Sequence, residues 1–252
     1  MLSDQQFMRY QRQVALPQIG EAGQQRLLNS QVLIIGCGGL GSAAAQFLAA
    51  AGVARLVIAD DDQVALSNLH RQLAYRAQDV GQPKVRTLAR SLQALNPDCQ
   101  VRTVERYMDA TLLNLEVGLA DVVLDCSDNL PTRHQVNRAC HQAGVCLISG
   151  SAIGWEGQLI PLDFTQRPQG CYQCVVPEQE SAAALRCSDM GVAGPVVGTI
   201  GNLQALLAVQ KLIQLEEFHS HYMQRFDALS MQWQKWQLIA DPHCLQCGCG
   251  KE

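Results

Sequence analysis

A glycine-rich loop with a carboxylate downstream gives this chain its first chemical signature. Gly36, Gly38 and Gly41 match the pattern Gly-x-Gly-x-x-Gly, with Gly39 as an additional glycine. Such a loop lets backbone N–H groups approach a phosphate at the positive end of a helix. Asp60 follows at about the 20-residue distance at which an acid usually holds a ribose hydroxyl. The pattern therefore predicts a nucleotide site.

Two cations in the next segment favour a triphosphate over a dinucleotide. Arg71 follows Ser67 and Asn68 closely, and Lys84 comes soon after. The pyrophosphate of a dinucleotide is largely satisfied by a helix end, whereas a triphosphate needs Arg, Lys and usually a metal. We therefore expect ATP. A plain dinucleotide oxidoreductase is the alternative that these residues leave open.

A further acid follows the strand predicted at residues 122–125. Asp128 and Asn129 come directly after it, and ligands of open parallel sheets bind outside the carboxyl ends of the strands. Asp128 is therefore a candidate ligand for Mg²⁺ beside the nucleotide. The alternative is that Asp128 only caps the helix that follows. The chain contains no Gly-x-x-x-x-Gly-Lys-Ser/Thr, so it is not a P-loop enzyme.

Two Cys-x-x-Cys pairs predict a structural zinc site. Cys171 with Cys174 and Cys244 with Cys247 each present two thiolates, and together they complete a tetrahedron with no position open for water. Such a site would tie the C-terminal tail to the middle of the chain. A disulfide pair or coincidence is the alternative, and Cys249 is a possible substitute ligand.

Composition limits the class of protein. The chain has 252 residues, 48% of them hydrophobic, which suffices for one extended domain or one domain with an appendage. A net charge of -4 gives no support to a nucleic-acid-binding surface. The polar N-terminus is unlike a signal peptide, and the longest apolar stretch, residues 192–209, is interrupted by Asn202 and Gln204. We expect a cytoplasmic protein with no membrane span.

Alternating strands and helices position the candidate residues. A capping box of Ser3 and Gln6 predicts a helix that ends at about Gln13. Strands are then expected at 32–35, 56–59, 101–105, 122–125 and 145–149, with helices over 42–51, 84–95, 111–119 and 132–143. This alternation predicts an α/β fold with a Rossmann-like, doubly wound, mostly parallel sheet covered on both faces.

After residue 150 the pattern changes. We expect antiparallel strands between Ile153 and Phe164, a crossover loop over 177–190, a helix over 195–215 and two strands within 222–239. Residues 1–150 would thus form an N-terminal helix and a nucleotide-binding α/β domain. Residues 151–252 would form an antiparallel C-terminal extension with the zinc site, continuous with the first part as one unit.

Taken together, these residues resemble the E1-like adenylyltransferases of the ThiF/MoeB/HesA family over nearly the whole chain. The motifs that carry the resemblance are Arg9-Tyr10-x-Arg12-Gln13, the glycine loop, Asp60-x-Asp62, Ser67-Asn68-Leu69-x-Arg71-Gln72, Lys84, Asp125-Cys126-x-Asp128-Asn129, Gly170-Cys171-Tyr172-x-Cys174, Gly191-Val192-x-Gly194-Pro195 and Cys244-x-x-Cys247. The residues around Cys171 and Gly194 favour the thiamine-biosynthesis branch over the molybdopterin branch. His70 stands where the family usually has Gln, which leaves that one contact open.

The resemblance implies the reaction. The C-terminal glycine carboxylate of a small ubiquitin-like sulfur carrier, ThiS-like, would attack the α-phosphate of ATP, with release of pyrophosphate. The acyl-adenylate would become a thiocarboxylate for thiamine thiazole synthesis, with a sulfurtransferase or cysteine desulfurase supplying sulfur. A carboxylate is already ionised near neutral pH, so alignment and charge neutralisation suffice without a general base.

The resemblance also implies a role for each site residue. Gly39 and its neighbours would hold phosphate, Asp60 the ribose, and Asn68, Arg71 and Lys84 would face the phosphates.

Three further roles follow from the same resemblance. Asp128 would bind magnesium, and Arg12 would reach the nucleotide site of the partner subunit across a two-fold homodimer. Cys187 matches the cysteine that is linked to the carrier during sulfur transfer, and Arg186 before it would favour the thiolate.

Three other functions stay open at this point. One is the molybdopterin-branch reaction, in which a MoaD-like carrier subunit is adenylylated. Another is a tRNA-modifying dehydratase, which the acidic balance and the paired cysteines disfavour. The last is a non-catalytic nucleotide-binding module that recruits ubiquitin-like partners.

Overall fold

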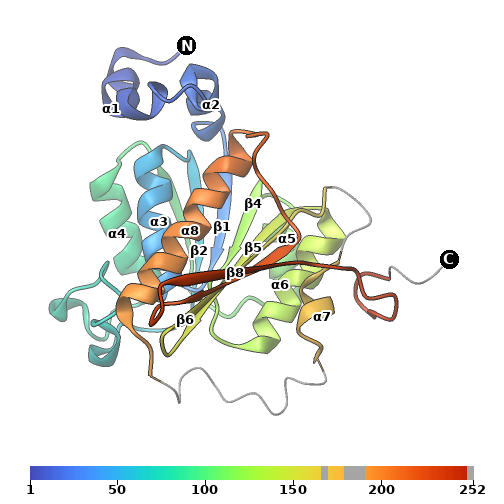
Figure 1. The fold of residues 1–252 in the computed structure, drawn as a ribbon. Coiled ribbons are helices and arrows are strands. Elements are labelled where there is room, and N and C mark those ends of the chain that lie inside the picture. Colours follow the sequence, from blue (N-terminus) through green and yellow to red (C-terminus); the bar gives the residue numbers. More distant parts are fainter. Residues whose placement is uncertain (166–169, 179–190, 249–252) are drawn as a thin grey trace.

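A single eight-stranded sheet forms the centre of the molecule (Figure 1). The structure, a computed structural model, describes residues 1–165, 170–178 and 191–248. The strands are β1 (Gln31–Ile35), β2 (Arg55–Ala59), β3 (Gln100–Val104), β4 (Val122–Asp125), β5 (Cys146–Ile153), β6 (Glu156–Leu162), β7 (Tyr222–Asp227) and β8 (Gln232–Gln237). They lie in the order β3-β2-β1-β4-β5-β6-β7-β8, parallel from β3 to β5 and antiparallel from β5 to β8.

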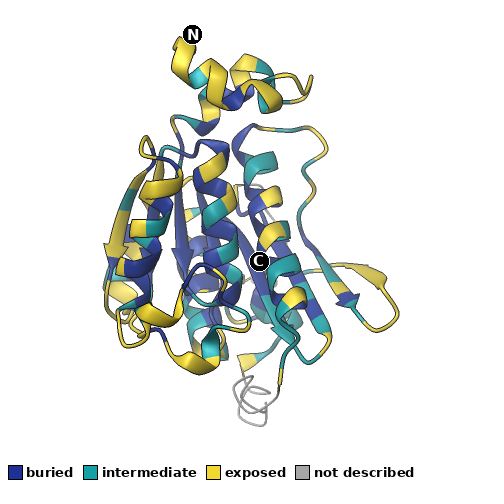
Figure 2. Ribbon diagram, turned by 90° about the vertical axis from the view of Figure 1, so that its left-hand side faces the viewer, coloured by how far each residue is buried: buried dark blue, intermediate teal, exposed yellow. Residues whose placement is uncertain are grey.

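Helices cover both faces of this sheet. They are α1 (Asp4–Val14), α2 (Gly20–Leu27), α3 (Gly39–Ala51), α4 (Lys84–Leu95), α5 (Ala110–Val117), α6 (Leu130–Ala143), α7 (Tyr172–Val175) and α8 (Gly194–Leu212), with 3-10 turns η1 (Leu66–Asn68) and η2 (Ala77–Asp79). Successive side chains of β1 point to opposite faces. Ile34 therefore packs with α3, α4 and α8, whereas Leu33 packs with α5 and α6. The central strands are buried on both sides, as Figure 2 shows.

The strand order reverses between β1 and β4. From β1 the chain runs outward to β2 and β3, and then returns to add β4 and β5 on the other side. Crevices form outside the carboxyl ends of parallel strands at such a switch point. The loops that follow β1 and β4 therefore meet there.

The amino-terminal helices sit at the far end of α3. The side-chain amides of Gln13 and Gln24 both donate to Ala51 O at 3.0 Å, which satisfies a carbonyl at the carboxyl end of that helix. Asn96 Nδ2 donates to Tyr10 Oη at 3.0 Å beside them. These buried amides attach α1 and α2 to the end of α3 that lies away from the glycine loop.

The fold class predicted from the sequence is confirmed, with shifted boundaries. Helix α3 begins at Gly39, inside the glycine loop, rather than after Gly41, because Gly38 is its N-cap. The strand expected at 145–149 runs on to Ile153 as β5, since it pairs with β6 over that length. The segment 153–164 accordingly supplies one strand of its own, β6.

Other segments differ from, or lie beyond, the sequence prediction. Helix α2 was not predicted, because two glycines and the absence of a capping side chain hide its short pattern. Residue 150 lies inside β5, so the sheet is continuous across the expected boundary. Of the expected crossover loop, residues 179–190 lie outside the described residues. Over the described part of the chain, every helix is too short or too polar to cross a membrane.

The packing of α1 and α2 against the end of α3 leaves no space for a side chain at Gly52. This residue has φ +94°, and a Cβ there would lie 2.7 Å from Gln24 Nε2 and 2.8 Å from the Tyr10 ring. We expect Gly52→Ala to lower the free energy of unfolding by about 3 kcal/mol or more, measured by urea denaturation. Gly81→Ala is the matched control, because Gly81 has φ +85° with open space around it and should cost only about 1 kcal/mol. Equal losses for the two variants would contradict the packing argument.

Candidate functional site

A cavity of about 690 Å³ opens at the switch point, which is within the usual size range of small-molecule sites. It collects most of the site residues predicted from the sequence. Those that line it are Gly36, Gly38, Gly39, Asp60, Ser67, Asn68, Arg71, Lys84, Asp128 and Asn129. They come from the ends of β1, β2 and β4, from the segment around η1 and from the start of α4, so residues far apart in sequence line one cavity.

The glycine loop allows an unusually close approach of backbone segments. Gly36 has φ +91°, and a Cβ there would lie 2.7 Å from the carbonyl oxygen of Cys126. A Cβ on Gly39 would lie 2.3 Å from Val197 Cγ1 and 2.9 Å from the carbonyl oxygen of Arg71. Only glycine fits at either place, and the cavity face of the loop is left as bare backbone at the amino end of α3.

Hydrogen bonds hold this loop from two sides. The Cys37 N–H donates to Asp60 Oδ2 at 2.6 Å, and the Tyr75 hydroxyl donates to Cys37 O at 2.6 Å. The Asp62 N–H donates to the other oxygen of Asp60 at 2.8 Å. Burial raises the pKa of Asp60, against the lowering effect of Lys84 and of these two N–H donors. Asp60 therefore lines the cavity and also fixes the glycine loop.

Acids and cations alternate along the walls. Lys84 is buried and forms an ion pair with Asp62 at 2.7 Å. Arg71 is half-buried, with Nη1 donating to Ser67 O at 3.1 Å. Arg106, which the sequence analysis did not single out, also lines the cavity. A ligand rich in phosphate would meet one cation that a neighbouring acid holds in place, Lys84, and one that a backbone carbonyl holds, Arg71.

The loop after β4 shows which residue caps helix α6. Asn129 is the N-cap of α6, since its Oδ1 accepts from the Thr132 N–H at 3.0 Å. Among the described residues, Asp128 accepts one long 3.5 Å contact, from Asn129 Nδ2, and it is exposed in the cavity wall. The alternative that Asp128 caps this helix is therefore wrong, and its carboxylate faces solvent in the cavity.

Three predicted residues lie elsewhere. Gly41 is buried inside the loop, where a Cβ would lie 1.8 Å from Gly36 O, so it shapes the turn instead of lining the cavity. Arg12 is exposed on α1, beyond the carboxyl end of α3, which over 13 residues is about 20 Å from the glycine loop. It is therefore outside the cavity of its own subunit. Cys187 lies outside the described residues.

Sequence reasoning missed two buried residues of this site. Arg133, in the first turn of α6, joins the ends of β4 and β5. Gln72 lines the cavity beside Arg71 and is 3% exposed, and its Oε1 finds no hydrogen-bond partner among the described residues. Gln72 belongs to the motif around Arg71, which could have pointed to it. For Arg133 no sequence spacing indicates that an arginine on a helix will point into the protein.

The four predicted zinc ligands lie together. Their Sγ atoms are all within 4.8 Å of one another, with 3.8 Å from Cys171 to Cys244 and 3.5 Å from Cys174 to Cys247. Tetrahedral zinc with Zn–S bonds of about 2.3 Å needs sulfurs about 3.8 Å apart. No disulfide joins any of the cysteines in the described ranges. A hydrogen bond between the side chains of Cys171 and Cys174 raises the pKa of the Cys171 thiol and lowers the pKa of the Cys174 thiol. The cluster therefore fits a closed zinc site, while Cys249 lies outside the described residues.

A doubly wound sheet with a glycine loop, cations and a free carboxylate around one cavity defines a nucleotide-binding α/β protein. The chain matches the ThiF family over residues 10–249, and it belongs to that family.

Relatives and solved structures agree with this assignment. The chain is 45% identical to the sulfur carrier protein ThiS adenylyltransferase of Escherichia coli K12, over 98% of this chain and 97% of that protein. It is 40% identical to the molybdopterin-synthase adenylyltransferase of the same organism, over 98% of both. The chain is thus a nucleotidyltransferase. A crystal structure of E. coli MccB with succinimide has the same fold, with a TM-score of 0.83 at 24% identity over 95% of this chain and 74% of that one.

The cysteine cluster gives a prediction about metal content. We expect about one zinc per chain by elemental analysis, and Cys244→Ser should remove it and lower the melting temperature by at least about 5 °C. The control is Cys99→Ser, which alters a buried cysteine outside the cluster and should keep the metal. Full zinc content in Cys244→Ser would show that the cluster is not the ligand set.

Proposed function

We propose that this protein adenylylates the C-terminal glycine of a ubiquitin-like sulfur carrier with ATP. The observation that carries the proposal is the convergence of the glycine loop, Arg71, Lys84 and Asp128 on one cavity. These groups match the charge and shape of a bound triphosphate better than those of a dinucleotide. ATP use is also what the adenylyltransferase relatives imply.

The chemistry asks for alignment more than for acid–base catalysis. The attacking group is a carboxylate, which needs no deprotonation at neutral pH. The backbone N–H groups at the start of α3 would receive phosphate oxygens, and Arg71 and Lys84 would neutralise charge as it moves to the leaving pyrophosphate. Asp60 would orient the ribose while it keeps the loop in place.

The charge balance of the cavity supports a role for a divalent cation. Four acids, Asp60, Asp61, Asp62 and Asp128, line the cavity together with the four cations Arg71, Lys84, Arg106 and Arg133. Protein charge is thus nearly cancelled before any nucleotide binds. Asp128, an exposed carboxylate in the loop after β4, would hold Mg²⁺, which when bound supplies further neutralisation of the phosphates.

Two carriers are candidates for the substrate. The 45% relative is named for ThiS, and we favour a ThiS-like carrier and thiocarboxylate formation for thiamine thiazole synthesis. The 40% relative is named for molybdopterin synthase, so a MoaD-like carrier is the second candidate. Cys187, together with a sulfurtransferase or cysteine desulfurase as donor, would serve the later sulfur transfer.

The site would be completed across a homodimer. Arg12 is too far from the cavity of its own subunit, yet it is exposed on a helix firmly attached to α3. We infer that a second copy of the chain receives this arginine at its nucleotide site.

Carrier-dependent exchange of pyrophosphate into ATP tests the proposed reaction. We expect exchange with a purified ThiS-like carrier, weaker exchange with a MoaD-like carrier, and none without a carrier. Asp128→Ala should reduce the rate at least about 100-fold, because charge neutralisation is lost. Asp98→Ala, an exposed carboxylate outside the cavity lining, should leave it unchanged. Absence of exchange with both carriers would refute the proposal.

Mixed dimers test the role of Arg12. Arg12→Ala and Asp128→Ala should each be inactive as homodimers, whereas co-expression should restore about a quarter of the wild-type rate per subunit. In half of the dimers the Asp128→Ala subunit would lend its intact arginine to an intact cavity. That rate is measured on the whole co-expressed mixture, and purification through two different tags, which keeps only the mixed dimers, should raise the recovery to about half. No recovery, with mixed dimers present, would place Arg12 outside the reaction.

A further inference from the structure

We propose that Arg133 is a positioning residue for this reaction. Its guanidinium sets the spacing between the loop that carries Asp128 and the β5 wall of the cavity. The inference rests on the proposed adenylylation and adds a residue to its machinery.

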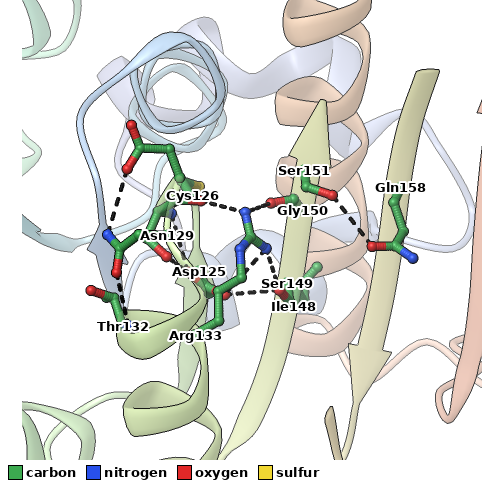
Figure 3. Close-up of polar contacts among 12 residues, drawn as sticks. Asp125, Cys126, Asn129, Thr132, Arg133, Ile148, Ser149, Gly150, Ser151 and Gln158 are labelled. Atoms are coloured by element: carbon green, nitrogen blue, oxygen red, sulfur yellow. Dashed lines mark hydrogen bonds and ion pairs between the residues drawn. The ribbon is translucent and has the colours of Figure 1, made fainter. Parts of the chain in front are cut away.

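The guanidinium of Arg133 lies between the ends of two strands (Figure 3). Nη2 donates to Ser127 O in the loop after β4, and also to Gly150 O of β5 at 3.0 Å. Nη1 donates to Ser149 Oγ at 3.1 Å and forms an ion pair with Asp125 Oδ2 at 3.6 Å. One side chain therefore bonds to both walls at the same time.

These contacts distinguish positioning from direct phosphate binding. Arg133 lines the cavity, but its side chain is only 6% exposed, and both of its Nη atoms already bond to protein acceptors. A phosphate would have to displace those acceptors, one of which is a buried carboxylate. Arg71, which also lines the cavity, is half-buried and contacts the carbonyl of Ser67 and the ring of His70 but no carboxylate that the structure describes, so it is better suited to contact the nucleotide itself.

The two walls carry different parts of the reaction. Ser127 directly precedes Asp128, whose carboxylate faces the nucleotide side of the cavity. Gly150 directly precedes Ser151, which also lines the cavity and donates to Gln158 Oε1 at 3.3 Å. An incoming peptide carboxylate has to meet the α-phosphate in the cavity that both segments line, so their relative position sets the attack geometry.

A buried network fixes the guanidinium in turn. Asp125 Oδ1 accepts from the hydroxyl and the N–H of Ser127 at 2.6 and 3.1 Å, and Oδ2 accepts from Ser149 Oγ at 2.8 Å. Gln204 Nε2 donates from α8 to the carbonyls of Asp125 and Ile148, each at 2.9 Å. The planar fork of an arginine can serve acceptors on two strands, whereas the ammonium of a lysine offers a single point charge.

This arrangement predicts which kinetic constant responds. The glycine loop and Asp60 hold their positions through hydrogen bonds of Cys37 and Tyr75 in which Arg133 takes no part. ATP binding should therefore survive a change at Arg133. Attack geometry should not, because a misplacement of about 1 Å can cost about 100-fold in rate.

The test compares Arg133→Lys with Arg102→Lys. The control also replaces an arginine paired with a buried carboxylate, Glu116, but that pair joins β3 to α5 away from the cavity lining. We expect Arg133→Lys to lower kcat of carrier-dependent exchange about 30-fold or more, with KM for ATP within about twofold of wild type. Arg102→Lys should keep both constants. Hydrogen exchange of residues 126–129 and 148–152 should quicken in Arg133→Lys alone.

The outcomes separate the inference from its premise. Wild-type kcat in folded Arg133→Lys would overturn the positioning role, as would a rise in KM for ATP with kcat unchanged. If Arg133→Lys fails to fold, Ser149→Ala decides: it removes one acceptor of the guanidinium and should lower kcat about 3-fold to 10-fold without a change in KM, and an unchanged kcat would overturn the inference. Absence of exchange in the wild-type protein would instead refute the proposed function.

Discussion

Close backbone approach at the strand switch point is the constraint on which the rest of the site depends. Gly36 lies against the backbone of Cys126, and Gly39 lies against Arg71 and Val197, at distances that leave no space for a Cβ. Because these segments touch, the ends of β1 and β4, the turn around η1 and the start of α8 surround one cavity. Any side chain at either glycine would separate the walls and remove the bare backbone from the phosphate side.

Electrostatic pairing determines how the cavity can bind a polyanion without being unstable when empty. Lys84 is held by Asp62, and Arg133 by Asp125, so buried cations keep their partners in the folded protein. The exposed Asp128 is different, since its contact from Asn129 is long. The cavity thus combines compensated charges at Lys84 and Arg133 with an exposed carboxylate, Asp128, that a ligand can reach.

The sequence predicted the sheet and most of the site because each rests on local pattern. Strand–helix alternation identified the parallel strands, and the glycine spacing located the loop next to its strand. Prediction was poorer where tertiary contact decides the outcome: α2 depends on packing of Leu27 and Gly23, and β5 is extended by its pairing with β6. Arg133 was missed for the same reason, since only the fold shows that this helical arginine turns inward to Asp125. Asp128 and Asn129 were both identified, but only the structure shows that Asn129 caps the helix and leaves Asp128 free of that role.

Helix α3 has a further consequence, because its two ends belong to different tasks. Its amino end lies in the glycine loop, where we propose that phosphate binds, and its carboxyl end holds α1 and α2 through Gln13 and Gln24. An α-helix of this length behaves as a stiff rod, so a tilt at one end appears at the other as a displacement. If Arg12 reaches the nucleotide site of a second subunit, then nucleotide binding in one subunit and the position of the Arg12 that it supplies to the other are mechanically coupled. A symmetric dimer with this arrangement has a structural route by which its two sites could bind nucleotide alternately.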